Sequence, residues 1–352
     1  MKLLRRNSIL AGGIALLLGL GLLLAAAALP RPLQSQRQAE RWAGESGKRF
    51  KQFTCVLSPG QSLDLETIYR FRSGASDKIA ASDFELPAGG SAFCDAWSVG
   101  GTLKVGGPRG RFDAAALSVG GRFFNFHPMP LLSGGYLSET DVMKDRVVLD
   151  EQLAWMLYGS TDLTGVTVEI GGLDFVVVGV VAQPDDRFTR AVSEGGPTLY
   201  MDFENRALTS ADGVVCYEVV LPEPVKGFAR SVAEDPFATR GLVVENTGRF
   251  SFGASMQRLR SIGKLGTRTT AVTFPVWENA AIAAETACAL LRFAALLCLI
   301  WPAVLLIAAL RLLLRFGGKK LKSGGRAAKE AMLDRRDAHR MRVISRKGSH
   351  TK

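Results

Sequence analysis

Histidine is scarce in this sequence: there are 3 among 352 residues, and only His127 lies outside the C-terminal tail. One imidazole cannot build a multi-histidine metal site, and it leaves a single general base for a catalytic triad. No G-x-S-x-G nucleophile motif occurs, and the stretch 44–48 lacks the glycine spacing of a phosphate-binding loop and is followed by Arg49 where such a loop needs Ser or Thr. We therefore expect no catalytic residues, no cofactor and no metal, and ATP hydrolysis cannot be placed on this chain.

Acidic residues are fewer than basic ones, 33 Asp and Glu against 44 Lys and Arg. The resulting formal net charge of +11 is concentrated near the two ends of the chain. Counted from the sequence, the tail 317–352 carries +9, whereas residues 31–291 carry −4. Nucleic-acid-binding proteins concentrate positive charge on a folded face, so no nucleic-acid partner is expected. The tail is suited to anionic lipid headgroups. A solvated or disordered tail is favoured over a docking helix.

Two uncharged runs are long enough for the hydrocarbon core of a bilayer: 21 residues at 9–29 and 18 at 293–310. Lys and Arg precede the first run and follow the second. Because positive residues accumulate on the cytoplasmic side of a membrane, both termini are expected in the cytoplasm and the central part outside. A cleaved signal peptide is the alternative for the first run, although the apolar region of signal peptides is shorter, about 7–15 residues.

The sequence thus predicts a two-pass protein of a bacterial cell membrane with five parts. They are a cytoplasmic N-terminus (1–8), a first transmembrane helix (9–29), an extracytoplasmic domain (30–277), a stalk with the second transmembrane helix (278–315) and a basic cytoplasmic tail (316–352). The polar run 34–51 is expected to extend the first helix into the outer space. Pro302 lies inside the second apolar run, where it would kink or loosen a helix.

The most regular stretch, 146–183, predicts a strand, a short helix and a hairpin. Asp150 can cap the helix, and Gly159 can end it in a left-handed conformation. Apolar and polar residues then alternate up to Gly171 and Gly172, which suit a two-residue turn. The return strand is interrupted by Gly179, which indicates a bulge or a close backbone approach.

The rest of the central region predicts an α+β fold. Strands are expected at 52–57, 79–86, 91–99, 214–221 and 242–245, and helices near 62 and over 225–234. Paired glycines, including those at 100–101 and 120–121, are expected to mark hairpins or loops. This order suggests a split ferredoxin-like subdomain interrupted by a β-rich insertion at about 103–210. The three cysteines of this region, Cys55, Cys94 and Cys216, leave one disulfide and three buried free thiols equally open.

The stretch 100–205 resembles the extracytoplasmic core domain of MacB/FtsX-like ABC transporter permeases. The resemblance is carried by Val147-Val148-Leu149, the helix start Asp150-Glu151-Gln152-Leu153-Ala154, Leu157-Tyr158-Gly159, Leu163-Thr164-Gly165 and Val177-Val178-Gly179-Val180. It implies a porter-like subdomain interrupted by a β-rich subdomain. It also implies a permease-like subunit that couples a separate cytoplasmic ABC ATPase to work by the outer domain. A full-length permease or a second copy of the chain is the expected membrane partner.

Permeases of that family add a cytoplasmic coupling helix and two more membrane helices, and no such segments follow residue 316 here. A second hypothesis is therefore a membrane-anchored extracytoplasmic binding or regulatory module, for example toward cell-wall enzymes, without transport coupling. The residues singled out in either case are structural. Gly165, Gly171, Gly172 and Gly179 are expected to shape the hairpin, and Phe123 and Phe124 to pack the inserted subdomain.

Overall fold

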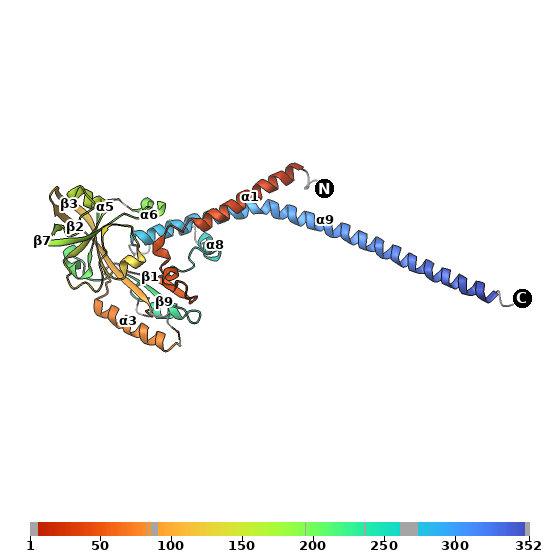
Figure 1. Ribbon diagram of the computed structural model, residues 1–352, viewed down its shortest axis with the longest axis horizontal. Helices are drawn as coiled ribbons and strands as arrows, with labels where there is room; N and C mark the ends of the chain where they lie inside the picture. The colour runs from red at the N-terminus through yellow and green to blue at the C-terminus, as the bar shows by residue number, and fades with distance from the viewer. Residues whose placement is uncertain are drawn as a thin grey trace. The chain divides into compact units, whose positions relative to one another are not determined.

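The computed structural model describes residues 6–82, 84–85, 91–193, 195–235, 237–260 and 274–348 (Figure 1). The chain forms two compact units. The larger unit is Ala26–Leu290, and the smaller combines Met1–Ala25 with Leu291–Lys352. Two helices contribute to both units, α1 (Arg6–Ala28) and α9 (Val276–Gly348).

Within the described residues, ten strands of the larger unit form one mixed sheet. They are β1 (Phe50–Leu57), β2 (Cys94–Gly107), β3 (Gly110–Gly121), β4 (Leu131–Gly134), β5 (Arg146–Asp150), β6 (Thr167–Ile170), β7 (Leu173–Val181), β8 (Thr198–Asp202), β9 (Cys216–Pro222) and β10 (Gly241–Glu245). The helices of this unit are η2 (Gln34–Gln36), α2 (Gln38–Ala43), α3 (Leu65–Ala80), α4 (Phe123–Phe126), α5 (Glu151–Tyr158), α6 (Arg187–Val192), η3 (Phe203–Thr209), α7 (Phe228–Glu234) and α8 (Phe252–Arg260).

One half of the sheet has the ferredoxin-like order. The strands β10, β1, β9 and β2 lie side by side, and each neighbouring pair is antiparallel. In chain order this is 4-1-3-2, with α3 after the first strand and α7 after the third, as in a β-α-β-β-α-β unit. Both helices pack into one apolar core with these strands, and Figure 1 shows α3 beside β1 and β9. The predicted split ferredoxin-like fold, with its insertion between β2 and β9, is confirmed.

Helix α3 is one place where the sequence prediction was wrong. Asp64 caps it by accepting a hydrogen bond from the Thr67 amide, and the helix then runs to Ala80. Its buried side chains recur at helical spacing and so form one face of the helix, which packs against the sheet. They are Ile68, Phe71, Ala75 and Ile79. The predicted strand 79–86 therefore begins inside a helix, because Ile79 continues this stripe; residues 83 and 86 of that prediction lie outside the described part.

The inserted half of the sheet grows from a long ribbon of β2 and β3. These two strands pair from Ala96↔Gly121 to Gly107↔Gly110. On the other side of β3 the sheet continues with β8, β5, β7 and β4, in that order. Helix α5 packs Leu153 and Leu157 into a second core beneath these strands. The prediction that the glycines at 100–101 and 120–121 mark hairpins or loops was wrong, because the first pair lies inside β2 and the second forms the last two residues of β3. A Cβ at Gly101 would come within 2.5 Å of the Thr209 Cβ, so the missing side chain makes room for η3.

The stretch from β5 to β7 follows local sequence rules closely. The Asp150 carboxylate accepts a 2.7 Å hydrogen bond from the Leu153 amide, and Gly159 ends α5 with a φ of +72°. Gly171 and Gly172 join β6 to β7 with φ values of +61° and +81°. The cap, the C-terminal glycine and the hairpin are as predicted.

The connection after α1 differs from its prediction. A continuous helical extension over 34–51 was expected, but α1 ends at Ala28 and two short helices, η2 and α2, follow before β1. Pro30 and Pro32 interrupt the chain there because proline lacks the amide that a helix interior needs.

Among the residues described, two helices are long and apolar enough to cross a membrane, α1 over Arg6–Ala28 and α9 over Val276–Leu314. Both run into the smaller unit. They approach closely where α1 has glycine: a Cβ at Gly19 would lie 2.8 Å from the Leu299 Cγ. Helix α9 continues through Pro302 and on to Gly348. The described tail backbone is thus helical, and whether the tail is solvated or docked, the choice weighed from the sequence, stays a prediction.

We predict that replacing Gly179 by alanine destabilises the larger unit. A Cβ there would lie 2.1 Å from the Gly135 carbonyl oxygen, where β4 lies against β7. Overpacking of this kind costs about 1–3 kcal/mol, which lowers Tm by about 2–4 °C for each kcal/mol in a domain of this size. Thermal unfolding of the full chain measures the change. The matched control is Gly100→Ala, also in a strand but with nothing within 4 Å of the added Cβ; an equal loss in both variants would contradict the steric argument.

Candidate functional site

The first turns of α9 are held to the larger unit by a buried polar cluster, which we call the α9 anchor: Gln36, Asn246, Arg249, Glu278 and Glu285. The Arg249 guanidinium donates from Nη1 and Nη2 to the two Glu278 carboxylate oxygens at 2.9 and 2.8 Å, and from Nε to Glu285 at 2.7 Å. Its Nη1 also reaches the Gln36 Oε1 at 2.8 Å, and the Asn246 amide donates to the same oxygen. The anchor therefore joins η2, the segment after β10, and α9.

The charges of the anchor are removed from water. The Arg249 side chain is 4% exposed and that of Glu278 is 0% exposed. Arg258 lies 3.9 Å from the second Glu285 oxygen, so two guanidinium groups face two carboxylates and the formal charges balance. Buried ions require such pairing, because an uncompensated charge in a low-dielectric interior costs several kcal/mol. The start of α9 is thereby fixed at one position on the domain.

An aromatic contact supports the same turn of α9. The Trp277 ring lies 4.2 Å from the His127 ring and 5.9 Å from the Phe123 ring, measured between centroids. His127 Nε2 is 2.5 Å from a carboxylate oxygen of Glu218, a side chain of β9 that is 2% exposed. The one histidine of this region is thus part of the packing under α9, at the end of α4.

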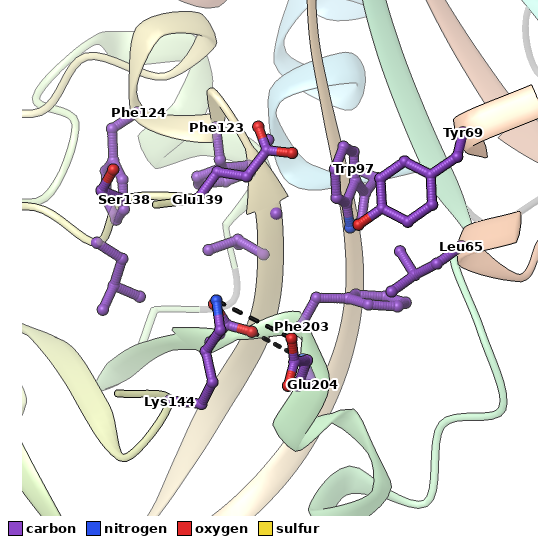
Figure 2. A pocket seen from close by; sticks show the side chains of 15 residues that line it. Leu65, Tyr69, Trp97, Phe123, Phe124, Ser138, Glu139, Lys144, Phe203 and Glu204 are labelled. Carbon is purple, nitrogen blue, oxygen red and sulfur yellow. Dashed lines mark hydrogen bonds and ion pairs between the residues drawn. The ribbon is translucent and has the colours of Figure 1, made fainter. Parts of the chain in front are cut away.

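A cavity of about 90 Å³ opens between α3, the β2–β3 ribbon, η3 and the segment 137–144 (Figure 2). Its walls are largely aromatic or aliphatic, and its mouth is polar. The apolar side chains are Leu65, Tyr69, Trp97, Val119, Phe123, Phe124, Leu137 and Phe203. The polar side chains are Ser138, Glu139, Lys144, Asp202 and Glu204.

Ion pairs cross the mouth of this cavity on two sides. Lys144 Nζ lies 2.9 Å from Asp202 and 4.0 Å from Glu204, as the dashed lines of Figure 2 mark. Burial alone would lower the pKa of Lys144, but these carboxylates raise it above its ordinary value, so the ammonium stays charged. On the other side Arg72 donates to Glu139 at 2.6 Å, and the same guanidinium holds the buried Asp95 at 2.8 Å. The segment 137–144 is thus tied to both α3 and η3.

The residues singled out from the sequence lie in two places, the cavity wall and the β6–β7 hairpin region. Phe123 and Phe124 lie on α4 and line the cavity, and Phe123 also touches Trp277 of α9. The four glycines do not line the cavity. Gly165, with a φ of +85°, precedes β6, Gly171 and Gly172 form the hairpin turn, and Gly179 lies within β7.

Sequence reasoning missed the α9 anchor. Its usable signal was the pair Glu278 and Glu285, which stand seven positions apart in an alanine-rich helix and so share one face. Nothing in the sequence singled out Arg249 as their partner.

The cysteines of the larger unit are free thiols. Cys55, Cys94 and Cys216 are buried in β1, β2 and β9 without disulfides, which is one of the two arrangements left open by the sequence. Burial raises the pKa of Cys94 to about 12 and raises those of the other two as well. Thiols protonated at neutral pH are poor nucleophiles, so these groups serve as packing. Among the residues described, no group of three His, Cys, Asp or Glu could hold a metal ion.

Comparison with known proteins identifies the domain that carries these features. Residues 52–226 match the family model of the MacB-like periplasmic core domain, a range that contains the predicted resemblance at 100–205. No curated protein matches the chain.

Solved structures of low similarity were also found. The extracellular domain of the noncanonic ABC-type transporter YknZ from Gram-positive bacteria is 15% identical, with 56% of this chain and 99% of that chain covered and a TM-score of 0.38. The periplasmic region of MacB from Actinobacillus actinomycetemcomitans is 16% identical (59% and 92% covered, TM-score 0.40). A domain of a putative permease from Porphyromonas gingivalis is 14% identical (58% and 87%, TM-score 0.32). With values this low, the family assignment depends on the core-domain match.

We predict that Arg249→Met destabilises the larger unit by about 3–5 kcal/mol, because it leaves the fully buried Glu278 without its cation. The double variant Arg249→Met/Glu278→Gln should recover part of this loss, since the unpaired charge is gone. Thermal unfolding of the full chain measures both.

The control for this pair is Arg230→Met, which removes a half-exposed guanidinium paired with Glu234 and Glu245 and should cost about 1 kcal/mol. Equal losses for Arg249→Met and Arg230→Met would show that the α9 anchor contributes nothing beyond a surface salt bridge.

Proposed function

Through residues 52–226 the chain belongs to the MacB-like ABC transporter permease family, and we propose that it is a permease-like subunit coupling a separate cytoplasmic ATPase to work outside the membrane. The core domain supplies the extracytoplasmic part of such a subunit. The chain supplies no phosphate-binding loop, so nucleotide hydrolysis would belong to the partner.

The observation that carries this proposal is the continuity of α9. The helix begins at the buried α9 anchor and runs without interruption through the apolar span that ends at Leu314. From Glu278 to Leu314 it extends about 54 Å at 1.5 Å per residue. A helix held at one end by a desolvated ion-pair cluster can pass a displacement at its other end to the domain. A loosely attached tether would absorb the displacement instead.

The proposed orientation follows from the flanking charges. Lys2, Arg5 and Arg6 precede the first span, and Arg311 and Arg315 begin the basic end of the second. Positive residues accumulate on the cytoplasmic side, so both termini lie there and Ala26–Leu290 lies outside. In that orientation the basic tail meets the anionic cytoplasmic leaflet, where each Lys or Arg contributes about 1 kcal/mol.

The orientation predicts opposite labelling of two introduced cysteines. Val142, 93% exposed in the larger unit, and Met332, 77% exposed in the tail, offer accessible positions. In intact cells a membrane-impermeant maleimide should label Val142→Cys and leave Met332→Cys unmodified until the membrane is permeabilised. The unsubstituted chain is the control, because its thiols in the larger unit are buried. Labelling of both positions in intact cells would contradict the proposed topology.

Coupling predicts a stable complex with the ATPase. When the full chain is solubilised from its native membrane and purified, it should bring with it a nucleotide-hydrolysing subunit, together with a full-length permease or a second copy of itself. Removing residues 317–352 should abolish recovery of the ATPase while the chain still inserts. Purification without any ATPase, and unchanged cellular activity after the truncation, would favour a membrane-anchored binding or regulatory module.

A further inference from the structure

His127 and Glu218 form a buried acid–base pair beneath the first turn of α9, apart from the ions of the α9 anchor. We propose that this pair holds one proton at neutral pH and releases it in alkaline medium, which loosens the attachment of α9 to the domain. The domain thereby responds to the pH of the compartment that it faces. The inference takes from the proposed function only that this compartment is the extracytoplasmic one; release of the proton needs no ATPase.

The surroundings of Glu218 call for a compensating charge. Its side chain is 2% exposed, and its neighbours on the same face of the sheet, Ala96 and Val220, belong to an apolar core. One carboxylate oxygen lies 3.5 Å from the hydroxyl of Thr54 on β1, and the other lies 2.5 Å from His127 Nε2. Among the residues that the structure describes, neither Lys nor Arg pairs with this carboxylate.

His127 is thus the group that can balance the charge of Glu218. A neutral imidazole could still donate a hydrogen bond from Nε2, but it would leave the carboxylate charge uncompensated in an apolar core. Burial of an uncompensated ion is unfavourable enough that the group takes up a proton or a cation instead. The two side chains together therefore hold one added proton, whichever of them carries it.

The other charged and titratable groups around the pair keep one state near neutral pH. Element by element they are Arg41 (α2), Cys55 (β1), Cys94 (β2), Arg122 (before α4), Tyr200 (β8), Cys216 (β9) and Glu278 (α9). The guanidinium groups remain charged. Burial raises the pKa of the three thiols and of the Tyr200 hydroxyl, so these four stay protonated. The Glu278 carboxylate is compensated by Arg249. A change of charge near neutral pH therefore belongs to His127 and Glu218.

Trp277 connects the proton to α9. Its ring centroid lies 4.2 Å from that of His127, and the next residue, Glu278, belongs to the α9 anchor. A cation within about 6 Å of an indole ring is attracted to it, so a protonated imidazole holds Trp277 more strongly than a neutral one does. Loss of the proton also leaves Glu218 as an uncompensated negative charge that repels Glu278. Hydration of Glu218 relieves this repulsion, and it requires the packing of Trp277 over the pair to open.

The first test is urea unfolding of the full chain in detergent micelles, followed by tryptophan fluorescence between pH 5.5 and 7.5. Free histidine loses its proton near pH 6.5, so above that value the unfolded chain binds about one proton fewer than the folded chain. Stability then falls as the pH rises, and the equilibrium constant for unfolding should increase about tenfold over this range. The range ends at pH 7.5 because free thiols of the unfolded chain begin to titrate above it.

Substitutions separate this pair from other sources of pH dependence. Glu218→Gln keeps the size of the side chain but removes the charge that holds the proton, so its unfolding constant should stay level or fall over the same range. The double variant His127→Phe/Glu218→Met contains neither titratable group and should also be level, which decides the matter if Glu218→Gln does not fold. The matched control is His339→Gln, which removes a histidine of the tail and should keep the tenfold increase. A level profile in the unsubstituted chain, or an increase that persists in the Glu218 variants, would overturn the proposal.

Hydrogen exchange of the backbone amides 279–283 measures the attachment of α9 directly. After correction for the intrinsic pH dependence of exchange, these amides should exchange at least threefold faster at pH 9 than at pH 7 in the unsubstituted chain. In Glu218→Gln the two rates should be equal. Equal rates in the unsubstituted chain would overturn the link between the proton and α9. None of these results depends on whether an ATPase co-purifies, so the permease proposal stands or falls separately.

Discussion

The desolvated guanidinium of Arg249 is the constraint around which the base of the larger unit is arranged. A cation that is 4% exposed must have partners, and it finds them in Glu278 and Glu285 of α9 and in Gln36 of η2. The partners come from two distant parts of the chain, η2 and α9, so one charge brings together the segments that enter and leave the domain. Moving α9 away would leave the buried Arg249 without both of its carboxylates, and this makes the start of α9 a fixed point.

The two features of the domain meet at α4. Phe123 lines the cavity and also contacts Trp277 and His127, while the next residue of α9, Glu278, belongs to the anchor. The four-residue helix α4 therefore contacts both the cavity and the first turn of α9. The ferredoxin-like half contributes β9 beneath this contact, with Glu218 against His127, and the inserted half contributes the segment 137–144 that closes the pocket. The insertion thus adds a surface to a unit whose other half holds α9.

Local patterns were reliable where one interaction decides the structure. Asp150, Gly159 and the glycines of the β6–β7 turn act within a few residues of themselves, and the structure places cap, helix end and hairpin as expected. The errors arose where distant partners decide. Gly101 lies inside β2 because Thr209 packs over it, and Ile79 is helical because its side chain completes the face that α3 turns to the sheet. Neither neighbour is visible in the adjoining sequence.

The amino-acid order alone determined the two apolar spans, the distribution of charge, the class of the domain and its family resemblance. These depend on composition, on periodicity and on turns of a few residues, all of which are local. Tertiary structure decided which charges meet and which aromatic side chains surround a cavity. Gln36 and Arg249 are 213 positions apart, and Arg72 and Glu139 are 67 apart, and no local preference specifies such pairs. They form because a folded sheet brings their strands and helices together and burial then leaves each charge a single set of partners.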